Sequence, residues 1–240
     1  MQIEAVLFDL FDTLVLLDSE EIYYPQALHK LHGFLIKNGI AVPFEDFSRA
    51  YFEVRDKFYS EARTSLTEPH FSVRVSQTLK RFGFKFAVSD PVVAGATMAF
   101  SDEFTRFMRL DEEAVTVLDK LYGKYKLGLV SNFAIPECCW KLLEKFGLKK
   151  FFEVVMISGE INRRKPSPEI FRRALKALGV EAQRAVFVGD MLDLDVRGPQ
   201  SVGMKTVFVK RRQINDGLGI KPDKIITRLS ELLPVLEDFQ

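Results

Sequence analysis

The stretch EAVLFDLFDTLV, residues 4–15, decides the fold of this 240-residue chain. Residues 3–8 form a continuous apolar run rich in Val, Leu and Phe, which is typical of a buried strand in a parallel sheet covered on both faces. Asp9 follows this run directly, and Phe11 and Thr13 come just after it. Ligands of open parallel α/β sheets bind beyond the carboxyl ends of the strands. The stretch therefore predicts a functional carboxylate, Asp9, at that edge of a sheet.

The second half of the chain alternates short apolar runs with amphipathic segments. Pro136 and Gly147 mark the two ends of one predicted helix, because proline suits the first helical turn and glycine the position past the last. Strands that take turns with helices in this way form parallel βαβ units. The predicted strands are residues 124–132, 151–158, 184–190 and 205–210, and the predicted helices are residues 136–147, residues 167–179 and a short stretch before Gly203.

The segment between residues 18 and 105 has a different pattern, with apolar residues at three- and four-residue spacing, which predicts helices. The segments with this spacing are residues 19–39, 43–64, 71–83 and 90–108. A helical block between the first strand and the rest of a parallel sheet is most simply an inserted cap. We therefore predict an α/β fold with two parts, a doubly wound, Rossmann-like parallel-sheet core of residues 1–16 and 105–240 and an inserted α-helical cap domain of residues 17–104.

The composition limits the partners that we expect. With 47% hydrophobic residues, 28% charged residues and a formal net charge of +1, the chain has no broad attraction for nucleic acid or an anionic membrane. No apolar run approaches the roughly 20 residues that cross a bilayer. Cys138 and Cys139 are neighbours and cannot form a disulfide framework, which favours a reducing compartment, and we expect a cytoplasmic protein. The sequence does not give the oligomeric state.

Several polar residues follow the predicted strands and should meet at one edge of the sheet. They are Asp9 after the first strand, Ser131 and Asn132 at the end of the second, Lys165 ahead of a helix, and Gly189, Asp190, Asp193 and Asp195 after a later strand. A nucleophilic carboxylate, a hydroxyl group, a cation and further carboxylates at one place suit the transfer of a charged group.

These residues carry a resemblance to the haloacid dehalogenase superfamily. The four motifs of that family are matched in order by FDLFDTL at residues 8–14, LVSN at 129–132, RKPSPEIF at 164–171 and VGDMLDLD at 188–195. The resemblance covers the predicted core, and the insertion after the first motif resembles the helical cap of one subgroup. It implies a hydrolase, most simply a Mg²⁺-dependent phosphatase acting on a small phosphorylated metabolite.

The resemblance also implies a nucleophile and a metal site. Asp9 would attack phosphorus and form an aspartyl-phosphate, which divides one difficult displacement into two easier ones. The carboxylates of Asp9 and Asp190 and the backbone carbonyl of Phe11 would hold Mg²⁺, because this ion prefers hard oxygen ligands.

The remaining motif residues would bind the phosphoryl group. Ser131, the backbone of Asn132 and Lys165 would hold the phosphoryl oxygens and offset their negative charge. Asp195 would orient Lys165 or a metal-bound water, and Asp193 is the alternative for this role.

The first motif departs from the pattern of the family's phosphatases. Phe11 stands where they have a second Asp, which protonates the leaving oxygen and then activates water. A positioned acid or base contributes roughly 10²- to 10⁴-fold, so the loss should slow the hydrolysis of alkyl phosphates most. Asp12 could replace the missing acid, or it could accept backbone hydrogen bonds in the turn.

Phe11 supports two alternative functions. In 2-haloacid dehalogenases of the same superfamily an aromatic residue commonly occupies this position, Asp displaces halide from carbon, and no metal is needed. Those enzymes typically have Ser in place of Asp190, whereas the acidic motif here is complete, and clustered carboxylates are costly without a cation. The third possibility is a catalytically weak domain that binds a phosphorylated ligand or a protein partner.

Two surface features complete the expectations. The cap is rich in aromatic residues, among them Tyr23, Tyr24 and Tyr59, and we expect it to close over Asp9, exclude bulk water and select a small substrate. The basic run KRR at residues 210–212 is typical of a solvated loop after a strand, and contact with a substrate phosphate is the alternative.

Overall fold

The computed structural model of the chain describes residues 2–211 and 219–239, and it is built on a six-stranded sheet. Each pair of neighbouring strands is parallel. In spatial order the strands are β5 (Val154–Ile157), β4 (Lys126–Ser131), β1 (Ala5–Phe8), β6 (Ala185–Gly189), β7 (Lys205–Val209) and β8 (Lys224–Ile226). Since β1 lies between β4 and β6, the strand order reverses beside it, which is the point where such sheets bind ligands.

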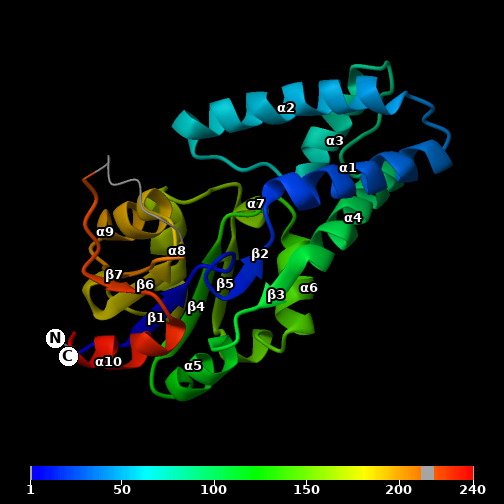
Figure 1. Cartoon of the computed structure of the whole chain (residues 1–240). Helices are drawn as coiled ribbons and strands as arrows, with labels where there is room; N and C mark the ends of the chain where they lie inside the picture. The colour runs from blue at the N-terminus through cyan, green and yellow to red at the C-terminus, as the bar shows by residue number, and fades with distance from the viewer. Residues whose placement is uncertain (1, 212–218, 240) are drawn as a thin grey trace.

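Helices cover both faces of this sheet, so the predicted doubly wound α/β fold is confirmed (Figure 1). Val6 and Phe8 of β1 pack in one hydrophobic cluster, and Ala5 and Leu7 pack in another on the opposite face. The first cluster includes side chains of α5 (Ala114–Leu121), α6 (Pro136–Lys145) and α10 (Leu232–Glu237), and the second includes those of α8 (Pro168–Leu178).

Local sequence explains why α8 begins just after the lysine motif. The Ser167 side chain accepts a hydrogen bond from the Glu169 N–H, and Pro168 occupies the first turn. Gly179 ends the helix with φ of 65°, a conformation that costs glycine little. These signals confirm the helix predicted over residues 167–179. They place Lys165 two residues before the N-cap residue, Ser167.

Four longer helices follow β1 and its loop, as the periodicity of residues 19–108 predicted. They are α1 (Glu20–Lys37), α2 (Phe44–Ser65), α3 (Phe71–Lys80) and α4 (Pro91–Phe104). In Figure 1, α1 and α4 run side by side, and α2 and α3 lie together beyond them. The helix predicted over residues 90–108 ends at Phe104, because the chain passes through a 3₁₀ turn into a strand.

A short antiparallel ribbon that the sequence did not predict joins these helices to the sheet. It consists of β2 (Val15–Leu17) and β3 (Met108–Leu110). Strands of three residues are too short to show a hydrophobic period, and β8 escaped prediction for the same reason. The boundaries expected after residue 16 and before residue 105 fall within or beside this ribbon.

The link between α2 and α3 is docked on the core. The Leu66 carbonyl accepts a hydrogen bond from the Arg164 N–H at 3.0 Å, and the Ala134 carbonyl accepts one from the Phe71 N–H at 2.8 Å. Glu68, on the same link, accepts a hydrogen bond from the Ser158 hydroxyl at 2.6 Å. The helical insertion therefore lies against the loops that follow β4 and precede α8.

Among the described residues, no helix combines the length and the apolar character needed to span a bilayer.

Candidate active site

The centre of the site is an ion pair between two buried residues from distant parts of the chain. Asp9 follows β1, and its N–H donates to the Val188 carbonyl at 2.9 Å, which continues the pairing with β6. The Lys165 Nζ lies 2.6 Å from Oδ1 of Asp9 and 2.7 Å from Oδ1 of Asp195. The three side chains are nearly inaccessible to solvent. The structure thus brings together three of the residues that the sequence singled out.

Asp190 completes a cluster of carboxylates at the same point. Oxygens of Asp9, Asp190 and Asp195 lie within 4.8 Å of one another. Burial raises the pKa of Asp9 to about 7, because the opposing effect of Lys165 is only partial and Asp195 adds repulsion. The pKa of Asp190 is raised to about 8, mainly by burial and in smaller part by repulsion from Asp9 and Asp195.

A divalent cation fits this donor set. Burial alone lowers the pKa of Lys165, but the charges of Asp195 and Asp9 outweigh it and raise that pKa, so Lys165 stays protonated. One ammonium group faces three carboxylates, and like charges at short range are unfavourable without further positive charge. Carboxylate oxygens are the ligands that Mg²⁺ prefers.

Asp195, rather than Asp193, is the partner of Lys165. It lies in a π-helical turn, Leu192–Arg197, where its Oδ2 also accepts a hydrogen bond from the Met191 N–H at 3.0 Å. Gly189 makes room for it, because a Cβ at position 189 would lie 2.5 Å from the Asp195 carboxylate carbon. Asp193 instead pairs with Arg197 in the same turn.

The end of β4 contributes two residues with different surroundings. The Ser131 hydroxyl is buried near the Cys139 thiol and makes no hydrogen bond of ordinary geometry within the described ranges. The Asn132 amide is engaged on both sides, because its Nδ2 donates to the Lys165 carbonyl at 2.9 Å and its Oδ1 accepts from the Lys165 N–H at 2.7 Å. The Asn132 side chain therefore positions Lys165, and its backbone stays the expected contact to substrate.

Phe11 belongs to an aromatic wall between the core and α4. Its ring centroid lies 4.9 Å from that of Phe133 and 6.3 Å from that of Phe104. Phe104 and Phe133 stack on each other at 5.2 Å, with 12° between their planes. The side chain that replaces the usual acid thus gives the site an apolar border.

Asp12 holds the turn after Asp9. Its φ of 54° is in the left-handed region, and its Oδ1 accepts a hydrogen bond from the Leu17 N–H at 3.2 Å. This contact is the backbone role that the sequence offered as the alternative to acid catalysis.

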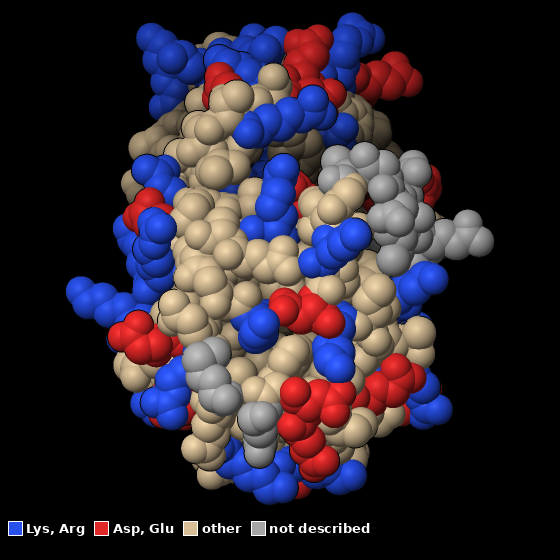
Figure 2. All heavy atoms as spheres, turned by 90° about the vertical axis from the view of Figure 1, so that its left-hand side faces the viewer, with Lys and Arg blue, Asp and Glu red and all other residues tan. Residues whose placement is uncertain are grey.

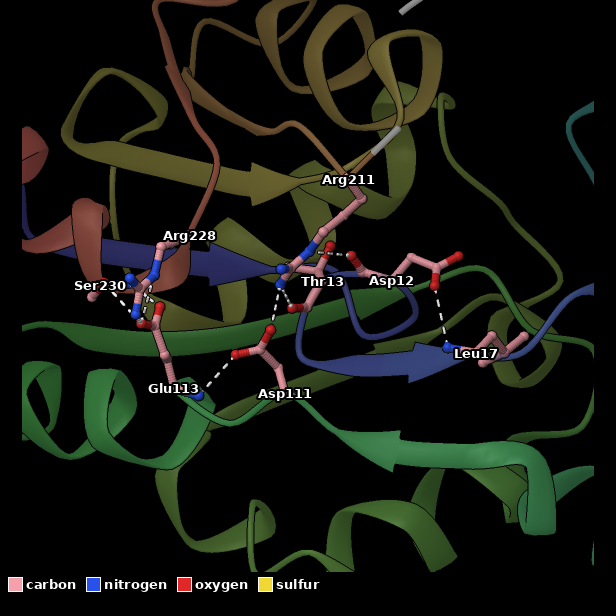
Figure 3. A network of polar contacts seen from close by, with 8 residues as sticks. All are labelled: Asp12, Thr13, Leu17, Asp111, Glu113, Arg211, Arg228 and Ser230. Carbon is pink, nitrogen blue, oxygen red and sulfur yellow. Dashed lines mark hydrogen bonds and ion pairs between the residues drawn. The ribbon is translucent and has the colours of Figure 1, made fainter. Parts of the chain in front are cut away.

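Arg211 is a functional candidate that the sequence did not reveal (Figure 3). Its Nε donates to the Asp12 carbonyl at 3.1 Å, and its Nη2 donates to the Thr13 carbonyl at 2.9 Å and pairs with Asp111 at 2.8 Å. The interpretation of residues 210–212 as a solvated loop is wrong for Arg211, whose side chain is only 18% exposed, and residue 212 lies outside the described residues. Arg211 ties the loop after Asp9 to the chain that leaves β3.

The same network continues to the C-terminal part of the chain. Asp111 accepts a hydrogen bond from the Glu113 N–H at 2.9 Å, and Glu113 accepts one from the Ser230 N–H at 3.0 Å and pairs with Arg228 (Figure 3). These contacts brace the segment between β3 and α5.

Two hollows open beside Arg164 of the lysine loop, which lines both of them. A cavity of about 200 Å³ lies between helices α1 to α4 and the loop after β4, and its walls include the expected cap residues Tyr23, Tyr24 and Tyr59. A wider cleft of about 640 Å³ lies between the end of α2 and the lysine loop, with Arg63 and Arg164 among its residues, and Lys165 reaches it. Figure 2 faces the side on which α2 ends, and basic side chains lie on both the helical insertion above and the core below, interspersed with acidic ones.

Comparison with known proteins identifies the class to which this fold and site belong. A family model described as a haloacid dehalogenase-like hydrolase matches residues 3–203. A glyceraldehyde 3-phosphate phosphatase of Methanopyrus kandleri is 33% identical over 252 residues, which cover 99% of this chain and 98% of that protein. The chain therefore belongs to the haloacid dehalogenase-like hydrolases, and the resemblance seen in its four motifs is confirmed.

Solved structures agree on the fold. A crystal structure of a phosphatase of this family from Thermococcus onnurineus is 29% identical, with a TM-score of 0.64 and coverage of 98% of each chain. A 2-haloacid dehalogenase from Pseudomonas syringae covers 100% of both chains with a TM-score of 0.77 at 23% identity, which is a likeness of fold alone.

Proposed function

We propose that this hydrolase is a Mg²⁺-dependent phosphatase that acts on a small phosphate monoester through an aspartyl-phosphate at Asp9. The observation that carries the proposal is the cluster at the centre of the sheet edge, where Lys165 contacts Asp9 and where oxygens of Asp9, Asp190 and Asp195 lie within 4.8 Å of one another. The similarity to proteins named as phosphatases supports it. The two free, buried cysteines suit the cytoplasm that we infer as its location.

In the first step a carboxylate oxygen of Asp9 attacks phosphorus, and the bond between phosphorus and the leaving oxygen breaks. Lys165, the Ser131 hydroxyl and the Asn132 N–H hold the phosphoryl oxygens and offset their charge. The carboxylates of Asp9 and Asp190 and the Phe11 carbonyl would hold Mg²⁺, which when bound supplies further positive charge at the phosphoryl group. In the second step water attacks the same phosphorus, releases phosphate and restores the Asp9 carboxylate.

The border formed by Phe11 determines which substrates should react well. No carboxylic acid at position 11 can protonate the leaving oxygen, and the Asp12 carboxylate accepts a backbone hydrogen bond. An alkoxide leaves poorly without a proton, whereas a phenolate needs little help. We infer modest turnover of alkyl phosphates and faster turnover of aryl phosphates of similar size.

The second candidate function is dehalogenation of a 2-haloacid, which the aromatic surroundings of Phe11 favour. Halide leaves without a proton, so an apolar border at this position would be no handicap. The complete acidic cluster argues against dehalogenation. Displacement of halide by Asp9 needs no metal, so it gives no reason for a second carboxylate at Asp190.

One assay separates these functions. Phosphate release from phenyl phosphate and ethyl phosphate, and halide release from 2-chloropropionate, are measured with Mg²⁺ and with a chelator. Phosphate release that needs Mg²⁺ supports the proposal, and halide release that survives the chelator overturns it. If neither product forms but phosphate analogues raise the melting temperature, the protein is a binding domain.

A further inference from the structure

A buried arginine in the helical insertion has no carboxylate partner within the described part of the chain. Arg74 lies on α3 and is only 8% exposed. Its Nη1 donates one long hydrogen bond, 3.4 Å, to the Tyr51 hydroxyl, and its Nε–H has no hydrogen-bond partner. Buried charges in proteins are normally paired, because an isolated charge loses its hydration without compensation. The guanidinium therefore requires another source of negative charge.

The aromatic side chains around Arg74 do not supply that charge. The ring centroids of Phe71 and Tyr59 lie 5.1 and 5.2 Å from its Cζ, and such contacts are attractive but leave the guanidinium cationic. Tyr24 and Tyr51 share a hydrogen bond of 2.7 Å between their hydroxyls, and burial raises the pKa of both phenols, so both stay neutral.

The acidic residues of the same cavity are engaged elsewhere. Glu20 pairs with Arg55 at 3.6 Å. Glu68 accepts the Ser158 hydrogen bond and pairs with Arg164 at 3.6 Å. Neither forms an ion pair with Arg74 among the described contacts.

Arg74 lines the cavity of about 200 Å³ between helices α1 to α4 and the loop after β4. Asn132 lines it too, and the same Asn132 side chain holds the backbone of Lys165. The cavity therefore shares Asn132 with the proposed phosphoryl site. A water molecule needs only about 10 to 15 Å³ of such space, so the cavity can hold a group larger than water.

We propose that this cavity receives a carboxylate of the substrate at Arg74, so that the substrate is the phosphate ester of a small hydroxy acid. The inference rests on the phosphatase function proposed above and adds the chemical class of the leaving group. The Nε–H and Nη–H edge of a guanidinium matches a carboxylate with two parallel hydrogen bonds. A monoanion also balances the charge of one guanidinium, whereas a second phosphate dianion carries one negative charge more than Arg74 can balance.

The kinetic test compares phosphoglycolate with ethyl phosphate, which has a methyl group in place of the carboxylate. In the wild type we expect kcat/KM for phosphoglycolate to exceed that for ethyl phosphate by about 10- to 100-fold, the range for hydrogen bonds to a charged group. Arg74→Met should remove most of this ratio, and Arg74→Lys, which keeps the charge but not the fork, should keep part of it. Arg55→Met is the matched control, because Arg55 lies over the Tyr59 ring as Arg74 does but does not line the cavity, and it should keep the full ratio.

A binding test needs no turnover and separates this inference from the proposed function. Calorimetry with Mg²⁺ compares 3-phosphonopropionate, which carries a carboxylate, with propylphosphonate, which does not. We expect at least tenfold tighter binding of 3-phosphonopropionate to the wild type, lost in Arg74→Met and kept in Arg55→Met. Circular dichroism of each variant verifies that it is folded.

The outcomes are distinct. If no phosphate ester is hydrolysed but the carboxylate preference in binding depends on Arg74, the phosphatase proposal fails and the anion site stands. If esters are hydrolysed but neither ratio exceeds about twofold, or Arg74→Met leaves both ratios unchanged, the inference is overturned and the phosphatase proposal stands.

Discussion

The Nζ of Lys165 lies 2.6 Å from Oδ1 of Asp9, although the two residues are 156 positions apart in the chain. The contact forms because Asp9 directly follows β1 in the middle of the sheet, while the Lys165 backbone is held by Asn132, which directly follows the neighbouring β4. Asp195 accepts from the same ammonium group at 2.7 Å, so one cation is shared by two carboxylates. Lys165 can therefore orient Asp9 while it keeps one hydrogen-bond donor for a phosphoryl oxygen.

Replacing the proposed nucleophile should abolish turnover without unfolding the protein. Asp9→Asn keeps the size of the side chain but removes the attacking charge, and we expect phosphate release from phenyl phosphate to fall by about 10³-fold or more. The fold should persist, because one of several crowded carboxylates becomes neutral. Steady-state phosphate release is the measurement, with Asp56→Asn on the exposed face of α2 as the control. Activity within tenfold of the wild type would show that Asp9 is not the attacking group.

Asp195 and Asp193 should differ in their effects, since only Asp195 contacts Lys165. Asp195→Asn should lower kcat by roughly 10- to 100-fold, because a hydrogen bond between two charged groups is lost and Lys165 is less well oriented. Asp193→Asn breaks an exposed ion pair with Arg197 and should change kcat by less than threefold. Equal losses in the two variants would contradict the assignment of Asp195.

Stability should depend on pH and on Mg²⁺ in a linked manner. The folded-state pKa values of Asp9, about 7, and Asp190, about 8, lie above the value of about 4 for an unfolded aspartate. Folded protein therefore holds protons that the unfolded chain releases, and this contribution to stability is complete below pH 4 and is lost as pH rises through 7 and 8. In a chelator, the free energy of unfolding should fall by up to about 7 kcal/mol between pH 5 and pH 8.5, since each group contributes about 1.4 kcal/mol for every pH unit between 5 and its folded-state pKa.

Mg²⁺ should reverse this loss, because it binds the deprotonated carboxylates. Urea unfolding at several pH values, with Mg²⁺ and with a chelator, measures both effects. Asp190→Asn is the control, since it removes the group with the higher pKa and should flatten the dependence on pH and on Mg²⁺. If the free energy of unfolding rises with pH in the chelator and does not change when Mg²⁺ is added, a metal site at these carboxylates is excluded.

The centre of the site was predictable from sequence, while its borders were not. Asp9, Ser131, Lys165 and Asp190 each follow a strand or precede a helix, and the parallel arrangement brings these ends to one edge whatever the details of packing. Arg211 and Arg74 lack such a rule. Arg211 reaches the carbonyls of Asp12 and Thr13 only because of the path that the chain takes after β7. Arg74 lies on the buried side of α3, and the hydrophobic periodicity of a helix does not distinguish a buried arginine stacked on aromatic rings from an arginine on the surface.

The acid that position 11 lacks should be restorable. Phe11→Asp places a carboxylic acid at the position that family phosphatases use for the proton of the leaving oxygen, and we expect hydrolysis of ethyl phosphate to rise by about tenfold or more. Hydrolysis of phenyl phosphate should change far less, because phenolate needs no proton to leave. Loss of the contacts with Phe104 and Phe133 should lower the free energy of unfolding by about 2 to 4 kcal/mol.

Phe11→Asn separates proton transfer from simple loss of the ring. It removes the same aromatic contacts and has no titratable group, so any gain that it shares with Phe11→Asp is due to space alone. Equal rates of the two variants on ethyl phosphate would mean that water or another group already protonates the leaving oxygen.

The Arg211 clamp should control the nucleophile loop rather than substrate affinity. Arg211 donates to two carbonyls of the loop that carries Phe11 and Asp12, and it anchors them to Asp111. Arg211→Lys keeps one charge but cannot make three directed contacts. We expect kcat to fall by about 10-fold or more with KM changed by less than threefold, because a loosened loop misplaces the Phe11 carbonyl and the attacking oxygen more than it weakens the phosphoryl contacts.

Arg228→Lys tests whether this effect belongs to the loop or to the whole network. Arg228 pairs with Glu113, one step further along the network from Asp111, and is mostly exposed. Its replacement should leave kcat nearly unchanged, since an exposed ion pair contributes little and touches neither Asp12 nor Thr13. If both lysine variants lowered kcat equally, the network would act by stabilising the fold as a whole. A loss confined to Arg211→Lys, at an unchanged melting temperature, requires that the guanidinium fixes the nucleophile loop directly.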